Sequence, residues 1–512
     1  MTDQRAVIEF LADPGTHGLG AGEVTRIDTH SAVVFLAGER VYKIKRAVDL
    51  GFLDFSTLAA RERFCRAEVE LNRRTAPALY LGVSTVNRDA GGRLALDGPG
   101  AIVEYVVVLR RFDQDTLFDR MAARGELDVP LMIRLADRIA AFHGEAAVVA
   151  DGAGADAVRA TVEGNRGSFA ALPAGILDAD TAETLTRDCL AAVGRLGGCL
   201  DRRARDGRVR RCHGDLHLRN ICLFEGEPTV FDCIEFNRSL SDIDVLYDLA
   251  FLLMDLWHRD LPGLANAVFN RYLDRRDEAD GVAALPLFMA MRAAIRAHVG
   301  ARAAGVQRER AAGEAQADEA RAYLALAARA LEAVPPRLVA VGGFSGTGKS
   351  SLAYALAPGL GVAPGARVLR SDVFRKRRFG RAPEAALPDE AYRPEVSEAV
   401  YAGVLERAGE LLADGHSVVL DMVFDRPEDR AAAEAVAATH GVPFTGFWLT
   451  APRDVLVERV RRRSDDASDA TVAVLDRQLA RGAGEPDWRQ LDATRPVEAL
   501  RREAESLLAG PG

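Results

Sequence analysis

The 512-residue sequence has very little lysine for a chain of otherwise ordinary composition. Only four of its 66 basic residues are lysine, namely Lys43, Lys45, Lys349 and Lys376, and all the others are arginine. An ammonium is a compact point charge and a guanidinium is a planar fork, so the two are not interchangeable at a phosphate or in a tight loop. A lysine that persists in so arginine-rich a sequence therefore marks a candidate functional position.

Long hydrophobic runs and paired cysteines are also absent from the sequence. No run of about 18 or more apolar residues occurs, so we expect no membrane span. The opening segment, MTDQRAVIEF, lacks a basic region followed by an apolar core, which argues against a secretory signal. The six cysteines form no CxxC pair. We therefore expect reduced thiols in a cytoplasmic protein, with neither a zinc site nor a disulfide framework.

The overall composition is typical of a folded protein, with 48% hydrophobic and 28% charged residues. The formal net charge of -9 argues against a large nucleic-acid surface, although it does not exclude one. A helix-rich stretch, about 285–331, is followed by Pro335 and Pro336, which cannot continue a helix. We predict a boundary there, with one domain at 1–334 and a second at 337–512.

The two domains show different patterns of secondary structure. In the first, the apolar runs 32–37 and 41–46 flank a Gly-Glu turn and predict a hairpin. A helical segment, about 56–74, and a strand at 101–111 follow, and most of the chain beyond is helical. The second domain alternates strand and helix, which predicts a parallel sheet with crossover helices. The fold class expected is an α+β bilobal domain followed by an α/β domain.

The segment 343–350, GFSGTGKS, fits the phosphate-binding loop G-x-x-x-x-G-K-[ST] and lies between a predicted strand and a predicted helix. Glycines let the backbone wrap a phosphate, and the helix N-terminus adds positive potential. Lys349 would reach the β and γ phosphates of ATP, and the Ser350 hydroxyl would bind Mg²⁺. The residues expected to hold the nucleotide are Gly343, Ser345, Gly346, Thr347, Gly348, Lys349, Ser350 and Ser351.

Further charged residues in this domain indicate phosphoryl transfer to a hydroxyl. Asp372 follows a predicted strand, where it would accept the hydroxyl proton, and Arg375 would hold an anionic acceptor. Asp421 ends the apolar strand 417–421, where it would contact Mg²⁺. Arg459 and Arg463 lie in an arginine run after the next strand, where a closing lid would stabilise the transferring phosphoryl group.

On these residues, 337–512 resembles the small P-loop kinases grouped with gluconate kinases, polynucleotide kinase 5′-domains and zeta-type toxins. The resemblance rests on the loop 343–350, on Asp372 with Arg375, and on Arg459 and Arg463. It implies ATP-dependent phosphorylation of a hydroxyl with Asp372 as the base. It does not identify the acceptor.

The segment 213–220, HGDLHLRN, is a second catalytic motif. Asp215 and Asn220 have the five-residue spacing of a kinase catalytic loop, in which the first orients or deprotonates the acceptor hydroxyl and the second binds Mg²⁺. The strand that should follow is 229–231, and it ends at Asp232, a second candidate metal ligand. His213 is better interpreted as support for the loop than as a base.

A kinase of this kind also needs a lysine on a strand of the small lobe and a glutamate on the next helix. Lys43 and Lys45 share one face of a predicted strand, and the sequence leaves both open, with Lys43 preferred. Glu68 is the preferred helix partner. Glu62 and Glu70 remain alternatives.

This half resembles the aminoglycoside phosphotransferase and choline-kinase-like branch of the protein-kinase fold over roughly 20–260. The resemblance is most specific at HGDLHLRN and at Phe231-Asp232. Asp248, in the downstream run 241–250, is implied to brace the catalytic loop. One departure is that no G-x-G-x-x-G covers the phosphates, because residues 29–32, THSA, precede the strand instead.

The sequence thus predicts a bifunctional ATP- and Mg²⁺-dependent kinase that acts on hydroxyl groups of a small molecule, with one ATP site per domain. Two alternatives stay open. In one, a nucleotide-binding pseudokinase regulates the P-loop kinase. In the other, the protein is a toxin-type kinase of polynucleotide ends or nucleotide sugars, for which the basic cluster 375–381 would provide the contact surface.

Overall fold

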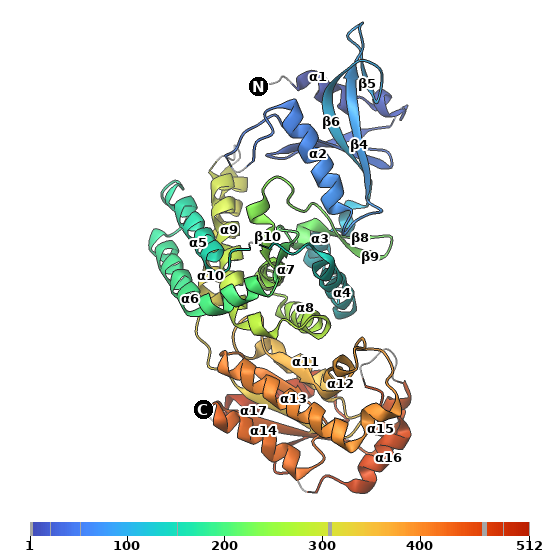
Figure 1. Ribbon diagram of the computed structural model, residues 1–512, viewed down its shortest axis with the longest axis vertical. Coiled ribbons are helices and arrows are strands. Elements are labelled where there is room, and N and C mark those ends of the chain that lie inside the picture. Colours follow the sequence, from blue (N-terminus) through green and yellow to red (C-terminus); the bar gives the residue numbers. More distant parts are fainter. Residues whose placement is uncertain are drawn as a thin grey trace. The chain divides into compact units, whose positions relative to one another are not determined.

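The computed structural model describes residues 4–20, 22–51, 53–150, 152–305, 310–462, 468–484 and 486–510 (Figure 1). By its contacts the chain divides into two compact units, which are considered separately below. Unit 1 comprises Met1–Ala153 and Ala204–Leu252, and unit 2 comprises Gly154–Arg203 and Leu253–Gly512. The boundary near residue 335 that the sequence suggests stays a prediction, because this division follows contacts and assigns the helices before that point to unit 2.

Unit 1 contains a six-stranded antiparallel sheet in the order β1-β2-β3-β6-β4-β5. Its strands are β1 (Val24–Asp28), β2 (Ala32–Ala37), β3 (Arg40–Lys45), β4 (Tyr80–Arg88), β5 (Leu94–Leu96) and β6 (Ala101–Arg110). The predicted hairpin is β2–β3, with Val34 opposite Lys43. The apolar residues alternate along these strands, so one face packs against helix α2 (Leu58–Asn72) around Cys65 and Val69, and the other faces α1 (Arg5–Ala12).

The rest of unit 1 consists of short strands and helices that follow the sheet. The short pairs are β7 (Val209–Arg211) with β10 (Asp242–Asp244), and β8 (Ile221–Phe224) with β9 (Glu227–Val230). The helices are α3 (Phe118–Ala123), α4 (Val129–Glu145) and α7 (Val245–His258), the last of which runs on into unit 2. The 3-10 turns are η1 (Pro14–His17), η2 (Gln114–Thr116), η3 (Leu218–Asn220) and η4 (Arg238–Leu240).

Unit 2 begins with helices that precede the phosphate-binding loop in sequence. They are α5 (Ala155–Ala170), α6 (Ala179–Arg205), α8 (Pro262–Arg275), η5 (Ala279–Ala284), α9 (Leu285–Ala304) and α10 (Arg310–Ala330). The stretch Ala279–Ala304 is long and apolar enough to cross a membrane, but 67% of its most apolar window is buried inside the fold. This burial is what the core helix of a globular domain shows.

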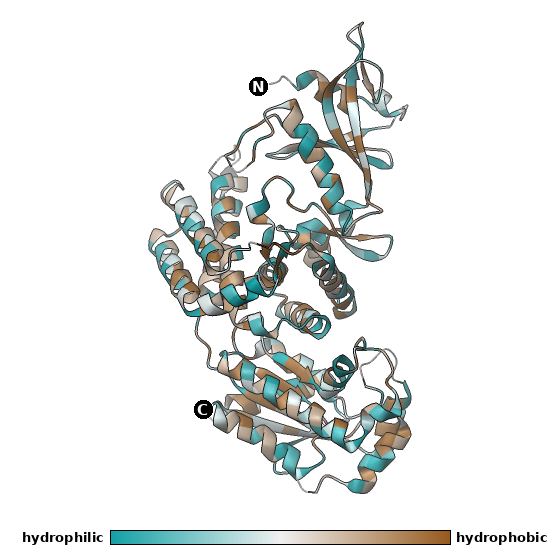
Figure 2. Cartoon of the chain, in the orientation of Figure 1, coloured by the Kyte–Doolittle hydropathy of each residue, from teal (hydrophilic) through white to brown (hydrophobic). Residues whose placement is uncertain are grey.

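The parallel sheet of unit 2 has the order β12-β13-β11-β14-β15. Its strands are β11 (Leu338–Gly343), β12 (Arg367–Arg370), β13 (Val418–Asp421), β14 (Phe444–Thr450) and β15 (Arg489–Asp492), and all neighbours are parallel. The central strands are apolar, as Figure 2 shows, because helices cover a sheet of this kind on both faces. The helices are α11 (Lys349–Leu356), η6 (Ala357–Gly359), α12 (Ser371–Arg378), η7 (Asp389–Tyr392), α13 (Pro394–Ala413), α14 (Pro427–Thr439), α15 (Arg453–Arg462), α16 (Val472–Arg481) and α17 (Val497–Ala509).

Helix α8 covers the edge strand β12 of this sheet. Asn270 Oδ1 accepts from Val368 N at 2.8 Å, and Asn270 Nδ2 donates to Ala366 O at 3.2 Å, so one amide satisfies two backbone groups that an edge strand leaves open. Beside it, Arg367 Nη2 lies 2.6 Å from Asp274 Oδ1, and both side chains are buried. A helix that precedes the P-loop segment by more than sixty residues thus completes its sheet.

We expect Asp274→Ala to lower the free energy of unfolding of this unit by about 3–5 kcal/mol, because the substitution removes the carboxylate that pairs with the buried Arg367 charge and leaves only the neutral Asn270 acceptors. Denaturant unfolding and hydrogen exchange of β12 would measure the loss. The matched control is Asp277→Ala, since Asp277 is 53% exposed in its ion pair with Arg377 and its loss should cost about 0–1 kcal/mol. Equal effects of the two substitutions would contradict the proposed closure of the edge.

Candidate active sites

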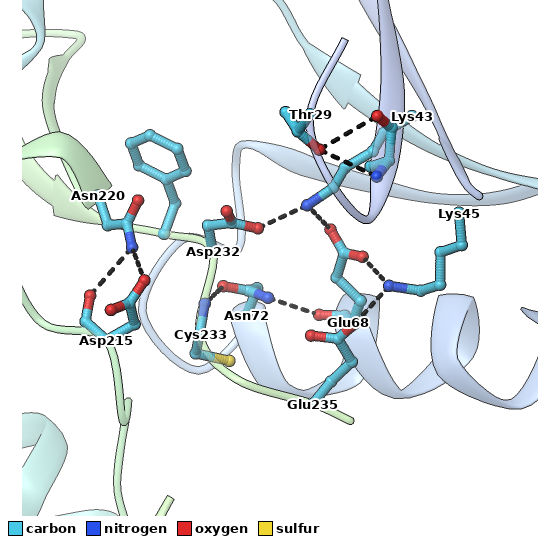
Figure 3. Close-up of polar contacts among 12 residues, drawn as sticks. Thr29, Lys43, Lys45, Glu68, Asn72, Asp215, Asn220, Asp232, Cys233 and Glu235 are labelled. Carbon is cyan, nitrogen blue, oxygen red and sulfur yellow. Dashed lines mark hydrogen bonds and ion pairs between the residues drawn. The ribbon is translucent and has the colours of Figure 1, made fainter. Parts of the chain in front are cut away.

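Asp215 and Asn220, the candidate catalytic-loop residues of unit 1, lie within hydrogen-bonding distance of each other. Asn220 Nδ2 donates to the Asp215 backbone oxygen at 3.0 Å and to Asp215 Oδ2 at 2.8 Å (Figure 3). His217 Nε2 lies 3.3 Å from Asp215 Oδ1. Because the Asn220 amide turns its nitrogen to Asp215, its Oδ1 is the end that remains for a metal ion.

A buried aspartate holds the start of this loop. Asp248 accepts from the backbone N–H of His213 at 3.0 Å and of Gly214 at 2.8 Å, which confirms the bracing that the sequence suggested. His143 Nε2 lies 3.1 Å from the same carboxylate. Gly214 has a φ of 85°, and a Cβ there would lie 2.7 Å from Leu240 O, so this turn requires glycine.

His213 is structural, as expected. Its Nδ1 accepts from Asp215 N at 3.2 Å, and its Nε2 is 2.9 Å from Phe231 O, so the ring joins the catalytic loop to the segment that leads from the end of β9, at Val230, to Asp232. Burial lowers the pKa of His213, which favours the neutral ring that this pattern requires, with the proton on Nε2.

Lys43 makes the glutamate contact expected of a kinase small-lobe lysine, and a second contact with Asp232 that the sequence did not predict. Its Nζ lies 2.9 Å from Glu68 Oε1 and 2.6 Å from Asp232 Oδ1, as Figure 3 shows. Burial by itself would lower the pKa of Lys43, but the Asp232 and Glu68 carboxylates raise it well above its ordinary value. Burial likewise opposes the ionisation of Glu68, yet Lys43 and Lys45 hold the pKa of Glu68 below its usual range. Lys43 and Glu68 are therefore both charged at neutral pH.

The sequence left open whether Lys43 or Lys45 is the small-lobe lysine, and the two side chains differ in burial and in partners. Lys45 is 3% exposed, and its Nζ contacts Glu68 Oε2 at 2.7 Å and the carboxylate of Glu235. Lys43 is therefore the lysine that a nucleotide can reach. Sequence reasoning missed Glu235. The available signal was its position three residues after Asp232, on the same segment.

The alternative helix partners lie elsewhere. Glu62 pairs with Arg66 on the exposed face of α2, and no ion pair of Glu70 is found among the described residues. The loop before β2 is a short turn, in which Thr29 Oγ1 accepts from Ala32 N at 2.9 Å and the Thr29 backbone N–H donates to Ala32 O. No glycine lies in this turn, so any cover over the phosphates differs from a glycine-rich flap.

In unit 2, the phosphate-binding loop leads from β11 into α11. Gly343, Gly346 and Gly348 have φ values of 141°, 88° and 86°. A Cβ would lie 2.8 Å from Leu449 O at Gly343 and 2.8 Å from Leu456 O at Gly346, whereas nothing lies within 4 Å of one at Gly348. The loop thus has the wrapped backbone that cradles a phosphate.

Other residues of the loop make local contacts. Lys349 Nζ donates to Phe344 O at 3.2 Å, Thr347 Oγ1 donates to the same oxygen at 2.8 Å, and Ser345 N donates to Gln478 Oε1 at 2.9 Å. Ser351 is exposed in the first turn of α11. Gln478, on α16, was missed because nothing in the sequence places it beside the loop.

The carboxylate at the end of β13 faces the loop. Ser350 Oγ donates to Asp421 Oδ2 at 2.6 Å, and Arg370 Nε lies 3.1 Å from the same oxygen. A hydroxyl and a carboxylate side by side are ligands that Mg²⁺ prefers. Arg370 was not assigned a role from the sequence, although it ends β12 directly before Ser371 and Asp372.

Asp372 lies in the first turn of α12 within electrostatic reach of this pair. Burial raises the pKa of Asp372, with Asp421 acting in the same direction, while Arg370, Lys349 and a hydrogen bond from Ser468 oppose the shift. A carboxylate that is hard to ionise binds a proton more strongly, which suits a general base.

Among the described residues, the arginines predicted for the site of unit 2 have no contact that shows the roles predicted for them. Arg375 is 6% exposed, donates to Ala391 O and Ser397 Oγ, and stacks on Tyr392, so its guanidinium supports the η7 turn. Arg459 is half-buried on α15, and no ion pair joins it to a described residue. Arg463 lies outside the described residues.

The basic cluster 375–381 is only partly at the surface. Lys376 is 1% exposed and lies 3.1 Å from Asp469. Arg377 lies 3.6 Å from Asp277 and donates to Leu273 O. Two of the cations, Arg375 and Lys376, are thus withdrawn from any surface that a polynucleotide would meet.

The donor sets fit ATP and Mg²⁺ at both sites. In unit 1 the oxygens of Asn220 and Asp232 would hold Mg²⁺, and Lys43 would meet the phosphates. In unit 2 Ser350 and Asp421 would hold the ion beside the glycine loop. Bound there, Mg²⁺ would neutralise charge that develops on the phosphates.

The folds and sites define a chain with two kinase-like domains, one of the aminoglycoside-phosphotransferase type and one P-loop domain with a parallel sheet. The family model described as "Phosphotransferase enzyme family" matches residues 107–285, and the model described as "AAA domain" matches residues 338–483. The chain is 30% identical over 478 residues to the uncharacterized protein Rv2004c of Mycobacterium tuberculosis (strain ATCC 25618 / H37Rv), over 92% of each chain. It belongs to the family of that protein, as does Mb2027c of Mycobacterium bovis (strain ATCC BAA-935 / AF2122/97), with the same identity and coverage.

Solved structures show similarity to parts of the chain. The choline/ethanolamine kinase family protein from Mesorhizobium loti is 16% identical, with a TM-score of 0.38, and the match covers 64% of this chain and 99% of that one. The gluconokinase from Sinorhizobium meliloti 1021 is 26% identical, with a TM-score of 0.25, and the match covers 34% of this chain and 92% of that one.

Proposed function

We propose that the chain is a bifunctional ATP-dependent phosphotransferase, in which each kinase-like domain transfers the γ-phosphoryl group of ATP to a hydroxyl of a small molecule. The observation that supports the proposal is that each unit holds a lysine at the position where kinases contact phosphates, together with an aspartate at the position of a catalytic base. These are Lys43 with Asp215 in unit 1, and Lys349 with Asp372 in unit 2.

In unit 1, Asp215 receives the proton of the acceptor hydroxyl. The hydroxyl oxygen forms a bond to the γ-phosphorus while the bond from that phosphorus to the bridging oxygen breaks, and ADP leaves with the bonding pair. Asn220 fixes the Asp215 carboxylate through its Nδ2, and Lys43 neutralises phosphate charge while Glu68 fixes its position.

In unit 2, Asp372 takes the same part and Lys349 contacts the β and γ phosphates. Arg370 pairs with Asp421 and brings a second cationic side chain to the site beside Lys349. Lys376 and Tyr392 both donate to the carboxylate of Asp469, and Arg375 donates to Ala391 O and Ser397 Oγ, so this arrangement gives no reason to restrict the acceptor to an anionic compound.

The test is a comparison of Asp215→Ala and Asp372→Ala with the parent protein, across sugars, nucleosides and aminoglycosides with ATP and Mg²⁺. Each substitution should remove one activity, by about 10²–10⁴-fold, and leave the other unchanged. If neither substitution alters any activity, the proposal is wrong.

The unit 2 activity should also depend on pH through Asp372. Since its pKa is raised, the basic form is lost on acidification at a higher pH than for an ordinary aspartate. The rate should therefore fall as pH drops through that raised pKa and be constant above it, in a pH–rate profile of kcat. An acid limb at the pKa of an ordinary aspartate would contradict the assignment.

A second candidate is a nucleotide-sensing unit 1 that regulates the P-loop kinase. The glycine-free turn at residues 29–31 favours it, because catalytic kinases cover the phosphates with a glycine-rich loop. Under this alternative, Asp215→Ala would retain full activity on every acceptor, while Lys43→Met would change the rate of the P-loop kinase.

A further inference from the structure

Five charged groups form one chain of ion pairs at the nucleotide site of unit 1. In order they are Asp232, Lys43, Glu68, Lys45 and Glu235, and each contacts the next (Figure 3). The two ends of this chain are three residues apart on the segment that follows β9. The network therefore ties β3, α2 and that segment into a closed ring.

The inner part of the ring is more deeply buried than the part that meets a ligand. Lys45, Glu68 and Glu235 are 3%, 0% and 7% exposed, while Lys43 and Asp232 are 18% and 43% exposed. Lys45 also lies over the Phe55 ring, 4.8 Å from its centroid. A phosphate group would reach Lys43 before Lys45. The role of Lys45 is therefore something other than direct contact with phosphate.

The two carboxylate oxygens of Glu68 contact one lysine each, which indicates the role of Lys45. Oε2 faces Lys45 and Oε1 faces Lys43, so the contact with Lys45 fixes the rotation of the carboxylate that Lys43 uses. Glu235 in turn neutralises Lys45. Without Glu235, the full charge of Lys45 would compete with Lys43 for the single negative charge of Glu68.

We propose that Lys45 and Glu235 are positioning residues, which hold Glu68 and thereby Lys43 in the place that binds the ATP phosphates before any nucleotide arrives. This inference rests on the proposed function of unit 1. It goes beyond that function in assigning a second lysine–glutamate pair to the assembly of the site.

The test uses the full-length chain with Lys349→Met, so that nucleotide binding reports on unit 1. Titration calorimetry with AMPPNP and Mg²⁺ measures affinity, and hydrogen exchange without nucleotide measures the order of α2 and residues 231–236. Glu235→Gln should weaken AMPPNP binding about 10-fold and raise exchange in both segments, because the residue keeps its shape but loses its charge. Glu235→Asp, which keeps the charge, should restore most of the affinity.

The matched control is Glu104→Gln. Arg61 and Glu104 form another fully buried ion pair between α2 and the same sheet, with Nε to Oε1 at 2.8 Å, but neither residue contacts Lys43. This variant should lose stability to a similar extent and retain its affinity for AMPPNP. If Glu235→Gln also loses stability and binds AMPPNP as tightly as the parent, the pair is merely structural and the inference is overturned.

A double variant, Lys45→Met with Glu235→Met, leaves no buried charge unpaired and serves if Glu235→Gln does not fold. Weaker AMPPNP binding by this folded double variant supports the inference, and unchanged binding overturns it. If the Lys349→Met parent itself binds no AMPPNP, the proposed function of unit 1 fails instead. The two failures are thus distinguishable.

Discussion

Lys349→Met should abolish the activity of the P-loop domain, with a loss of about 10²–10³-fold in kcat on its acceptor. Lys349 follows three glycines whose φ angles are positive. Its Nζ donates to Phe344 O, within the same loop. Methionine fills a similar volume without the charge, so the loop keeps its shape but loses the cation that meets the β and γ phosphates. Steady-state rates with saturating ATP would measure the change.

The reciprocal variant, Lys43→Met, is the control for this result. It should remove the activity of the first domain and leave that of the P-loop domain intact, because the proposal gives each lysine a separate phosphate site. Loss of both activities in either single variant would contradict independent sites. Full retention of P-loop activity in Lys349→Met would contradict the assignment of the loop.

Asp232→Asn should reduce the activity of the first domain by about 10²–10³-fold and weaken its dependence on Mg²⁺. Asparagine preserves the shape of the side chain and tolerates the left-handed backbone at this position, where φ is 61°. The change therefore removes a negative charge from the metal site and from Lys43 with little backbone strain. Rates measured over a series of Mg²⁺ concentrations would test it.

The control for Asp232→Asn is Asp242→Asn in the same unit. Asp242 pairs with Arg211 at 3.0 Å, and among the described residues no contact joins it to a candidate catalytic residue. Its substitution should leave both the rate and the Mg²⁺ dependence near those of the parent. A metal dependence of Asp232→Asn that matches the parent would exclude Asp232 as a ligand.

The local motifs were readable from the sequence because their chemistry fixes their spacing. Asp215 and Asn220 are close in sequence and in space, and the glycines of 343–350 can be recognised from their backbone requirement alone. The parallel sheet followed from the alternation of apolar strands and helices. Expectations of this kind depend on contacts within one loop or one strand–helix unit, where sequence distance and spatial distance agree.

Other features depended on groups that the chain brings together from far apart. The sequence placed Lys43 and Lys45 on one strand face but gave no reason to assign Glu68 to both. It gave Glu235 no role at all. In unit 2, nothing in the local pattern of α8 indicated that Asn270 and Asp274 complete the edge of a sheet that begins more than sixty residues later.

The sequence by itself thus determined the class of the chain and the chemical groups of its two proposed phosphate sites, since a glycine loop or an Asp–Asn pair is specified by neighbouring residues. Only the tertiary structure decided which carboxylates pair with Lys43 and which with Lys45. Whether a buried lysine faces a phosphate or a glutamate depends on which distant carboxylates surround it, and the free energy of those pairs arises only once the fold has removed them from water. For Lys43 that environment leaves a path to a ligand, and for Lys45 it does not.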